Sequence, residues 1–190
     1  ELDDGEIVPV DFFHGGWGKI AAAASTQYVI DSWHPELVLN LGTCGGFAGE
    51  IAQGEIVLVE KTVVYDILEQ MGDPAAHLSH YTTHLDLSWL GETYPHPVTK
   101  ATVVSGDRDL VPSEIPWLKS RFAAWAGDWE SAAIAWVASH NSQRCLILRG
   151  VSDLVDEKGS PAYADGDYFE QAAQNLMHRL VGMLPAWISL

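Results

Sequence analysis

Apolar runs of strand length alternate along the chain with segments of helical period, and this alternation predicts an α/β fold with a mostly parallel sheet. The run at residues 37–41 has apolar residues on both of its faces, as strands of a sheet covered on both sides have. The predicted strands are residues 7–13, 37–41, 55–60, 61–67, 101–104, 124–129 and 144–149, and the predicted helices are residues 19–33, 112–122, 131–140 and 168–184.

The 190 residues read as a single domain, because no linker, internal repeat or low-complexity tract divides them. Residues 70–98 have no clean hydrophobic period, and we expect them to form a peripheral insertion.

The charge of the chain excludes two classes of partner. It has 26 acidic and 10 basic residues, a formal net charge of -16, and its basic residues are scattered along the sequence. Such a surface repels phosphate groups, so we expect neither nucleic acid nor an anionic membrane surface to be a partner. No apolar run reaches the roughly 18 residues that span a bilayer.

The two cysteines and the first residues bear on localisation. Cys44 follows one apolar run and Cys145 lies within another, as buried free thiols of a reducing compartment do. The first six residues have neither the basic nor the apolar region of a secretion signal. We therefore expect a cytoplasmic protein.

Ligands of α/β proteins bind beyond the carboxyl ends of the strands, which here are the predicted turns at Gly42, Ser105, Trp129 and Ser152. The turn at residues 42–46 offers the backbone N–H groups of a Gly-rich segment and the hydroxyl of Thr43 to a ligand; the alternative is a tight exit from a strand. It has neither the dinucleotide-binding spacing nor that of a P-loop.

Two turns carry carboxylates. Asp128 and Glu130 precede a helix that either could cap, but Glu130 could equally accept hydrogen bonds from the vicinal hydroxyls of a sugar. Asp153 follows a buried strand, where Asp is commonly a turn or cap residue. Buried near Glu130, it could instead hold a proton for donation.

Three histidines, His77, His80 and His84, have nearly the spacing of one helical face, and such a face could hold a metal ion. Their Thr-containing context and their place in the expected insertion favour surface histidines, so we expect no metal. The sequence has no G-x-S-x-G nucleophile motif.

Five segments, in this order, resemble the nucleoside phosphorylase and nucleosidase superfamily, and most closely its 5'-methylthioadenosine/S-adenosylhomocysteine nucleosidases. The segments are GGWGKIAAA at 15–23, NLGTCGG at 40–46, SGD at 105–107, DWESAAIA at 128–135 and RGVSDLVD at 149–156. The resemblance implies a three-layer α/β fold around a mixed, mostly parallel sheet flanked by helices. It also implies a homodimer that cleaves the N-glycosidic bond of a purine nucleoside without a cofactor.

Carried over by position, the resemblance implies that Asp153 protonates or hydrogen-bonds N7 of the purine. Glu130 would hold the ribose hydroxyls, and Trp129, where the family usually has Met, would pack against the sugar. Backbone groups near Leu110 and Ser152 would face the base.

The resemblance also bears on the nucleophile. The phosphorylases have an Arg just before the glycine turn, where this chain has Asn40, as the nucleosidases do; this favours water over phosphate, although Arg108 could supply the missing cation. The alternative function is therefore a phosphate-dependent purine nucleoside phosphorylase.

Three departures from the family leave other functions open. The family begins with a strand whose adjoining turn bears the water-activating glutamate, and we expect this sequence to start after that element, so this base is not assigned. Asp109 stands where adenine-specific members often have an aromatic residue, and Trp129 changes the sugar pocket, so another nucleoside such as futalosine is an alternative substrate. One alternative hypothesis is a non-catalytic nucleoside-binding module. Another is a metal-dependent hydrolase that uses the three histidines.

Overall fold

The computed structural model describes residues 7–156, 158–160, 162 and 166–190 and has the expected α/β architecture. The strands are β1 (Val38–Phe47), β2 (Ile56–Val64), β3 (Thr82–His84), β4 (Thr99–Ser105), β5 (Ala124–Asp128) and β6 (Cys145–Val155). The α-helices are α1 (Gly18–Trp33), α2 (Pro74–His80), α3 (Ile115–Phe122), α4 (Ser131–His140) and α6 (Gly166–Ile188), and two 3-10 turns are η1 (Ser88–Leu90) and η2 (Pro112–Glu114).

The sheet is mixed and closes on itself. Its order is β3-β2-β4-β5-β1-β6, and β2 also pairs with β6, so five strands form a barrel with β3 at its margin. The β1–β6, β2–β4 and β4–β5 pairs are parallel, whereas β1–β5, β2–β6 and β2–β3 are antiparallel. The expected mixed sheet flanked by helices is confirmed, but three of its six strand pairs are antiparallel and it closes into a barrel. The excess of parallel pairs was wrongly predicted, because hydropathy reports which strands are buried but not which of them pair.

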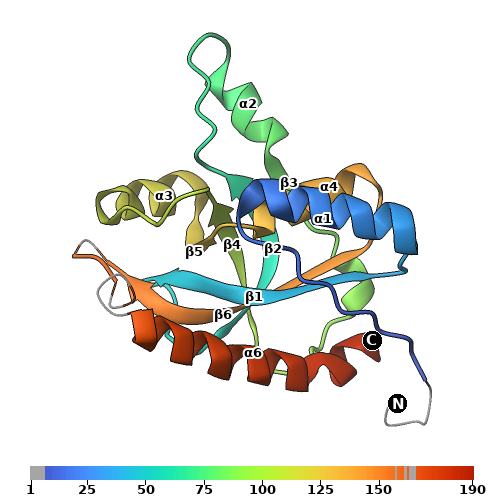
Figure 1. Cartoon of the computed structure of the whole chain (residues 1–190). Helices are drawn as coiled ribbons and strands as arrows, with labels where there is room; N and C mark the ends of the chain where they lie inside the picture. The colour runs from blue at the N-terminus through green and yellow to red at the C-terminus, as the bar shows by residue number, and fades with distance from the viewer. Residues whose placement is uncertain (1–6, 157, 161, 163–165) are drawn as a thin grey trace.

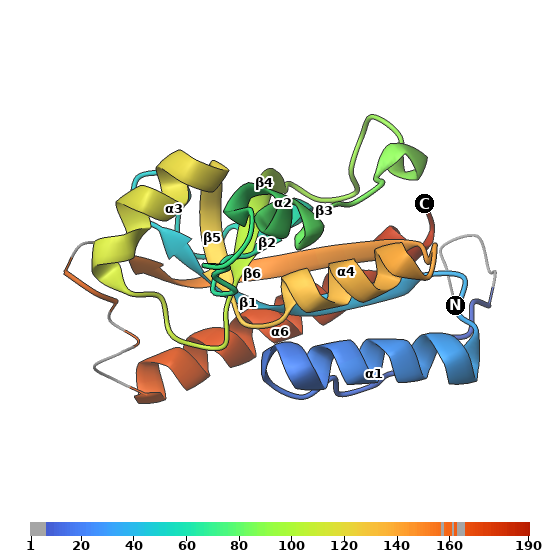
Figure 2. The ribbon, with the colours of Figure 1, turned by 90° about the horizontal axis from the view of Figure 1, so that it is seen from above.

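Helices cover both sides of the barrel. Figure 1 shows α6 below the strands and α1 with α4 above them, and Figure 2 shows α1 and α4 running side by side. Successive residues of a strand point to opposite sides of the sheet. In β2, Ile56 and Leu58 belong to the hydrophobic cluster that includes Leu180 and Trp187 of α6. Val57 and Val59, which alternate with them, belong to the cluster on the α4 side. This explains the strand runs that are apolar on both faces.

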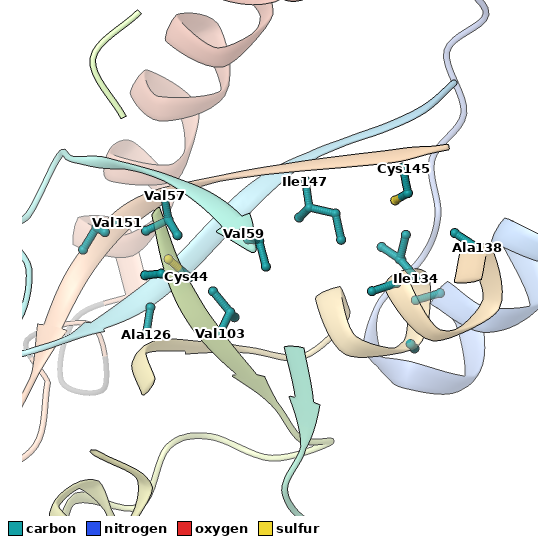
Figure 3. Packing of buried hydrophobic residues seen from close by; sticks show 14 of the residues in the cluster. Cys44, Val57, Val59, Val103, Ala126, Ile134, Ala138, Cys145, Ile147 and Val151 are labelled. Carbon is teal, nitrogen blue, oxygen red and sulfur yellow. The ribbon is translucent and has the colours of Figure 1, made fainter. Parts of the chain in front are cut away.

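The cluster on the α4 side joins distant parts of the chain (Figure 3). Val57, Val103 and Ile147 come from three strands of the barrel and are fully buried, and Ile134 and Ala138 of α4 pack with them. This packing brings the N-terminus of α4 to the strands that carry the candidate site residues.

Four predicted elements are wrong, and one of them is the turn predicted at Ser152, which lies inside β6 because that strand continues to Val155. Residues 7–13 form no strand, and Ile7 and Phe12 are 80% and 73% exposed, because a β-prone segment becomes a strand only with a partner to pair with. Residues 42–46 are not a turn but the second half of β1, paired with β6. The two strands predicted in residues 55–67 are one strand, β2, whose polar centre at Glu60 and Lys61 coincides with a register shift against β4.

Residues 70–98 contain α2, β3 and η1, of which β3 pairs with β2 (Figure 1). Figure 1 shows α2 projecting from the body of the domain. Among the helices of the described residues, none combines the length and the apolar character that crossing a membrane requires.

Candidate functional site

Charged residues gather where β5 ends, beside the middle of β1 and β6. Asp128 is the last residue of β5 and Glu130 follows it, while Arg149 and Asp153 lie within β6. Gly42 of β1 is the register partner of Arg149, and Gly45 pairs with both Asp153 and Gly127. The barrel thus brings together carboxylates that are far apart in the sequence.

Two of these residues, Asp128 and Arg149, form a buried ion pair. Nε of Arg149 lies 2.8 Å from Oδ2 of Asp128, and both side chains are almost completely buried. Asp128 also accepts hydrogen bonds from the hydroxyls of Ser105 and Ser131, and Nε of Arg149 donates to the Ser131 hydroxyl at 2.7 Å. Nη2 of Arg149 is buried without a hydrogen-bond partner among the described residues.

Gly42 makes room for this arginine. A Cβ at Gly42 would lie 1.6 Å from Nη1 of Arg149, so the guanidinium rests directly on the backbone of β1. Glycine here admits a side chain of the protein itself, whereas the sequence suggested that it admits a ligand.

The two carboxylates after β5 have different tasks. Asp128 accepts from the backbone N–H groups of Glu130 and Ser131 and so binds the start of α4. Glu130 makes no side-chain cap to α4; its Oε1 accepts instead from the N–H of Gly18, the first residue of α1, at 2.9 Å. The capping alternative is therefore correct for Asp128 toward α4, and Glu130 contacts a different helix.

The surroundings of Glu130 raise its pKa above the ordinary value of a glutamate. Partial burial raises the pKa of Glu130 above the ordinary value, the Gly18 N–H lowers it, and the negative charge of Asp128 raises it further. Arg149 and the backbone N–H of Trp129 act in the lowering direction.

Asp153 is buried in β6 and is held by two hydroxyls. Ser152 Oγ donates to Oδ1 of Asp153 at 2.6 Å, and Ser160 Oγ donates to Oδ2. Asp153 is neither a turn residue nor a helix cap, so the usual structural explanations for an Asp after a strand do not apply.

The remaining candidates surround these carboxylates. Leu110 is buried over two glycines: a Cβ at Gly45 would lie 3.2 Å from its Cδ1, and one at Gly127 would lie 2.7 Å from its Cδ2. The same position on Gly45 is 3.9 Å from Oδ2 of Asp153, so Leu110 and Asp153 flank one stretch of β1. Trp129 is 40% exposed beside Glu130. Thr43 lies in β1 opposite Gly150.

A cavity of about 730 Å³ opens beyond the carboxyl ends of β1 and β6. It is lined by Ala48, Val155 and Asp156 from these ends and by Ile115 and Lys119 of α3. Neither Asp153 nor Glu130 lines this cavity, and none of the other predicted site residues does, so it is separate from the carboxylates described above.

The three histidines do not form a metal site. Within residues 7–156, 158–160, 162 and 166–190, no group of three His, Cys, Asp or Glu side chains is placed to hold a metal ion. His77 and His80 lie on α2 and His84 on β3, and the His80 ring packs edge-on against Tyr81 and Trp136.

Sequence reasoning missed two contributors to the site. Arg149 was read as part of a buried strand, although a charged residue in a run as apolar as Leu146–Ile147–Leu148 is itself a signal for a buried partner. The start of α1 was not connected to Glu130 at all, and no local pattern predicts that contact between residues 112 positions apart.

Two curated proteins with the same name align with nearly the whole chain. The 5'-methylthioadenosine/S-adenosylhomocysteine nucleosidase of Maridesulfovibrio salexigens is 30% identical over 190 aligned residues, which cover 93% of this chain and 81% of the relative. The nucleosidase of the same name from Tolumonas auensis is 26% identical, covering 97% of this chain and 85% of the relative.

Solved structures share the fold. The Helicobacter pylori nucleosidase, determined in complex with a substituted pyrrolidin-3-ol, has a TM-score of 0.75 at 18% identity, and the match covers 93% of this chain and 78% of that protein. The Neisseria meningitidis nucleosidase in complex with methylthio-immucillin-A has a TM-score of 0.71 at 24% identity, covering 93% and 79%.

The family comparison spans nearly the whole sequence. Residues 5–184 match the phosphorylase superfamily, and the five segments that suggested this resemblance all lie within that range. This chain therefore belongs to the phosphorylase superfamily.

Proposed function

We propose that this protein hydrolyses the N-glycosidic bond of a purine nucleoside of the methylthioadenosine or adenosylhomocysteine type, giving free base and sugar. The proposal is carried by two carboxylates, buried Asp153 in β6 and half-buried Glu130 just after β5, in a chain whose relatives are nucleosidases for these two compounds. The two carboxylates have separate surroundings and can take separate tasks.

Asp153 is assigned to the base. As the C1'–N9 bond breaks, its electron pair moves into the purine and the oxygen of a water molecule bonds to C1'. Asp153 in its protonated form gives its proton to N7, which makes the purine a better leaving group, and the proton that the water loses restores the protonated form of Asp153. Ser152 and Ser160, whose hydroxyls donate to the Asp153 carboxylate, would orient it toward the base. Leu110 and the backbone near Ser152 would complete the surface against the purine.

Glu130 is assigned to the sugar. Its Oε1 is held by the Gly18 N–H, which leaves lone pairs of the carboxylate for the ribose hydroxyls. Exposed Trp129 would pack against the sugar, and Thr43 would contribute a hydroxyl. A negative charge beside the sugar would also stabilise a transition state of oxocarbenium character. Gly42 would act indirectly, by admitting Arg149.

Water is the proposed nucleophile. Asn40 replaces the arginine of the phosphorylases, and Arg108, the other candidate cation, is engaged: its Nη2 lies 2.7 Å from Oε2 of Glu114 and its guanidinium lies over the ring of Tyr65. A phosphate dianion would therefore find little fixed positive charge at either position.

We further propose a cytoplasmic homodimer that uses neither a metal nor an organic cofactor. Cys44 and Cys145 are buried and unpaired, as thiols of a reducing compartment are. Leu68 and Met71, on the segment leading to projecting α2, are 66% and 98% exposed and offer apolar surface to a second subunit.

The test is release of free base, followed by chromatography. The protein is incubated with methylthioadenosine, adenosylhomocysteine, adenosine, inosine and futalosine, with and without phosphate. We expect release without phosphate and at least a hundredfold lower turnover for Asp153→Asn, the order of magnitude of a general-acid contribution. Release only with phosphate would identify a phosphorylase, and binding without release would identify a non-catalytic module.

A further inference from the structure

A charge network holds the first residues of α1 next to Glu130. Lys19 of α1 forms ion pairs with Asp66, just after β2, and with Oδ2 of Asp107, just after β4, the latter at 3.5 Å. Asp66 Oδ2 in turn accepts from the backbone N–H of Asp107 at 2.9 Å. Lys19, Asp66 and Asp107, which we call the α1 clamp, thus tie three separate segments together.

The clamp compensates for a helix start without its own cap. The N-cap residue Trp17 makes no side-chain cap, and the first turn of α1 contains no acidic residue. Free N–H groups at a helix start need acceptors. Those of Gly18 and Lys19 find them in other elements: Glu130 accepts from Gly18 at 2.9 Å, and Asp107 accepts from Lys19 at 2.7 Å.

The Lys19 side chain is well placed to control this arrangement. It is only 15% exposed, as is expected of a cation whose charge is neutralised locally, and Asp66 is 17% exposed. Without the ammonium group, Asp66 and Asp107 would face each other as uncompensated like charges. The start of α1 would then lose one of the two carboxylates that fix its position.

We propose that Lys19, with Asp66 and Asp107, acts as a positioning device that aims the Gly18 N–H at Glu130 and so fixes the carboxylate for recognition of the sugar hydroxyls. The inference rests on the proposed function, because it deepens the role of Glu130 in sugar recognition. Lys19 touches neither base nor sugar in this account and acts through Gly18.

A fixed Glu130 carboxylate is expected to make the protein selective for nucleosides whose ribose keeps both vicinal hydroxyls. A carboxylate fixed in one rotamer accepts hydrogen bonds from a vicinal diol without losing further conformational freedom, whereas a mobile one must be ordered on binding. Loss of the α1 clamp therefore weakens the binding of a ribonucleoside more than the binding of its 2'-deoxy counterpart.

The experiment compares kcat and KM of Lys19→Met with wild type on a ribonucleoside and on its 2'-deoxy counterpart. We expect the ratio of the two kcat/KM values to fall about tenfold, the size of one lost charge-assisted hydrogen bond, chiefly through KM for the ribonucleoside. Lys19→Arg keeps the cation and should restore most of the ratio. Lys61→Met, which removes a half-buried lysine bound to the Phe122 carbonyl, is the matched control and should leave the ratio unchanged.

A double-mutant cycle with Glu130→Gln separates positioning from a general loss of stability. If Lys19 acts through Glu130, Lys19→Met adds nothing to the ratio change in the Glu130→Gln background. Additive effects, or a lower melting temperature with an unchanged ratio, would overturn the inference. If Lys19→Met does not fold, Asp66→Asn breaks the same ion pair from the other side and is read in the same way.

Failure of the proposed function gives a different result. In that case the wild-type protein releases no base, or Glu130→Gln leaves both kcat/KM values unchanged. If instead wild type is active and Glu130→Gln lowers the ratio while Lys19→Met and Asp66→Asn do not, the proposed function stands and the positioning role is wrong.

Discussion

The backbone N–H of Gly18 donates to Oε1 of Glu130 at 2.9 Å, and this one hydrogen bond joins the start of α1 to the residue that precedes α4. The contact is specific to glycine for two reasons. Gly18 has a φ of +78°, and a Cβ there would lie 2.9 Å from Oδ1 of Asp107.

Gly18→Ala is therefore expected to lower kcat/KM about tenfold or more, because relief of the clash moves the N–H away from Glu130. Gly54→Ala is the matched control: Gly54 has a similar φ of +82°, but a Cβ there meets nothing within 4 Å. Both variants introduce backbone strain, but only Gly18→Ala also disturbs the hydrogen bond to Glu130. A comparison of their steady-state kinetics therefore separates the effect of strain from the effect of losing this hydrogen bond. Equal losses of activity would contradict the assignment.

The pH dependence of turnover should report on Glu130. Its ionised form accepts hydroxyl hydrogen bonds, and burial raises its pKa above the ordinary value, so activity falls on the acid side at a higher pH than for an exposed glutamate. The profile of kcat/KM on the ribonucleoside measures this acid limb. The Glu130→Gln variant should lack it, and an unchanged acid limb in that variant would assign the titration to another group.

The Asp128–Arg149 pair should dominate the stability of the site. Asp128→Ala leaves a buried guanidinium without its counter-charge, for which we expect a loss of about 3–5 kcal/mol in the free energy of unfolding, measured by urea denaturation. Glu114→Ala breaks the partly exposed pair with Arg108 and should cost about 0–1 kcal/mol. Similar losses for the two variants would show that Arg149 is not dependent on Asp128.

Neither cysteine should react with thiol reagents in the native state. Burial raises the pKa of the Cys44 thiol far above its ordinary value, and burial raises that of Cys145 to about 12. An assay with Ellman's reagent should detect two thiols only after denaturation. Rapid labelling of the folded protein at neutral pH would mean that one of these strands opens to solvent.

Much of the architecture could be predicted from local patterns. The helical period of residues 19–33 and 131–140 corresponds closely to α1 and α4, and the buried run at 144–149 lies within β6. These predictions succeed because burial of a face imposes a period on the sequence. The strand predicted at residues 7–13 fails because pairing, unlike burial, leaves no local trace.

The candidate site divides in the same way. Carboxylates next to apolar strands and turns are conspicuous, so Glu130 and Asp153 became candidates from the residues around them. Their roles came from the family resemblance and stay predictions. Arg149 was overlooked, and its position over Gly42 depends on the parallel register of β1 and β6. The contribution of Lys19 depends on two loops, those after β2 and β4, meeting at the start of α1.

The sequence by itself determined the α/β class, most of the elements, the superfamily and two candidate carboxylates, because hydrophobic period and ordered motifs are local properties of the chain. Only the tertiary structure decided that the sheet closes through β2 and β6, that Asp128 binds α4 while Glu130 binds α1, and that Arg149 rests on Gly42. These contacts join residues far apart in sequence, and their partners are selected by barrel closure and strand register, which no single segment encodes.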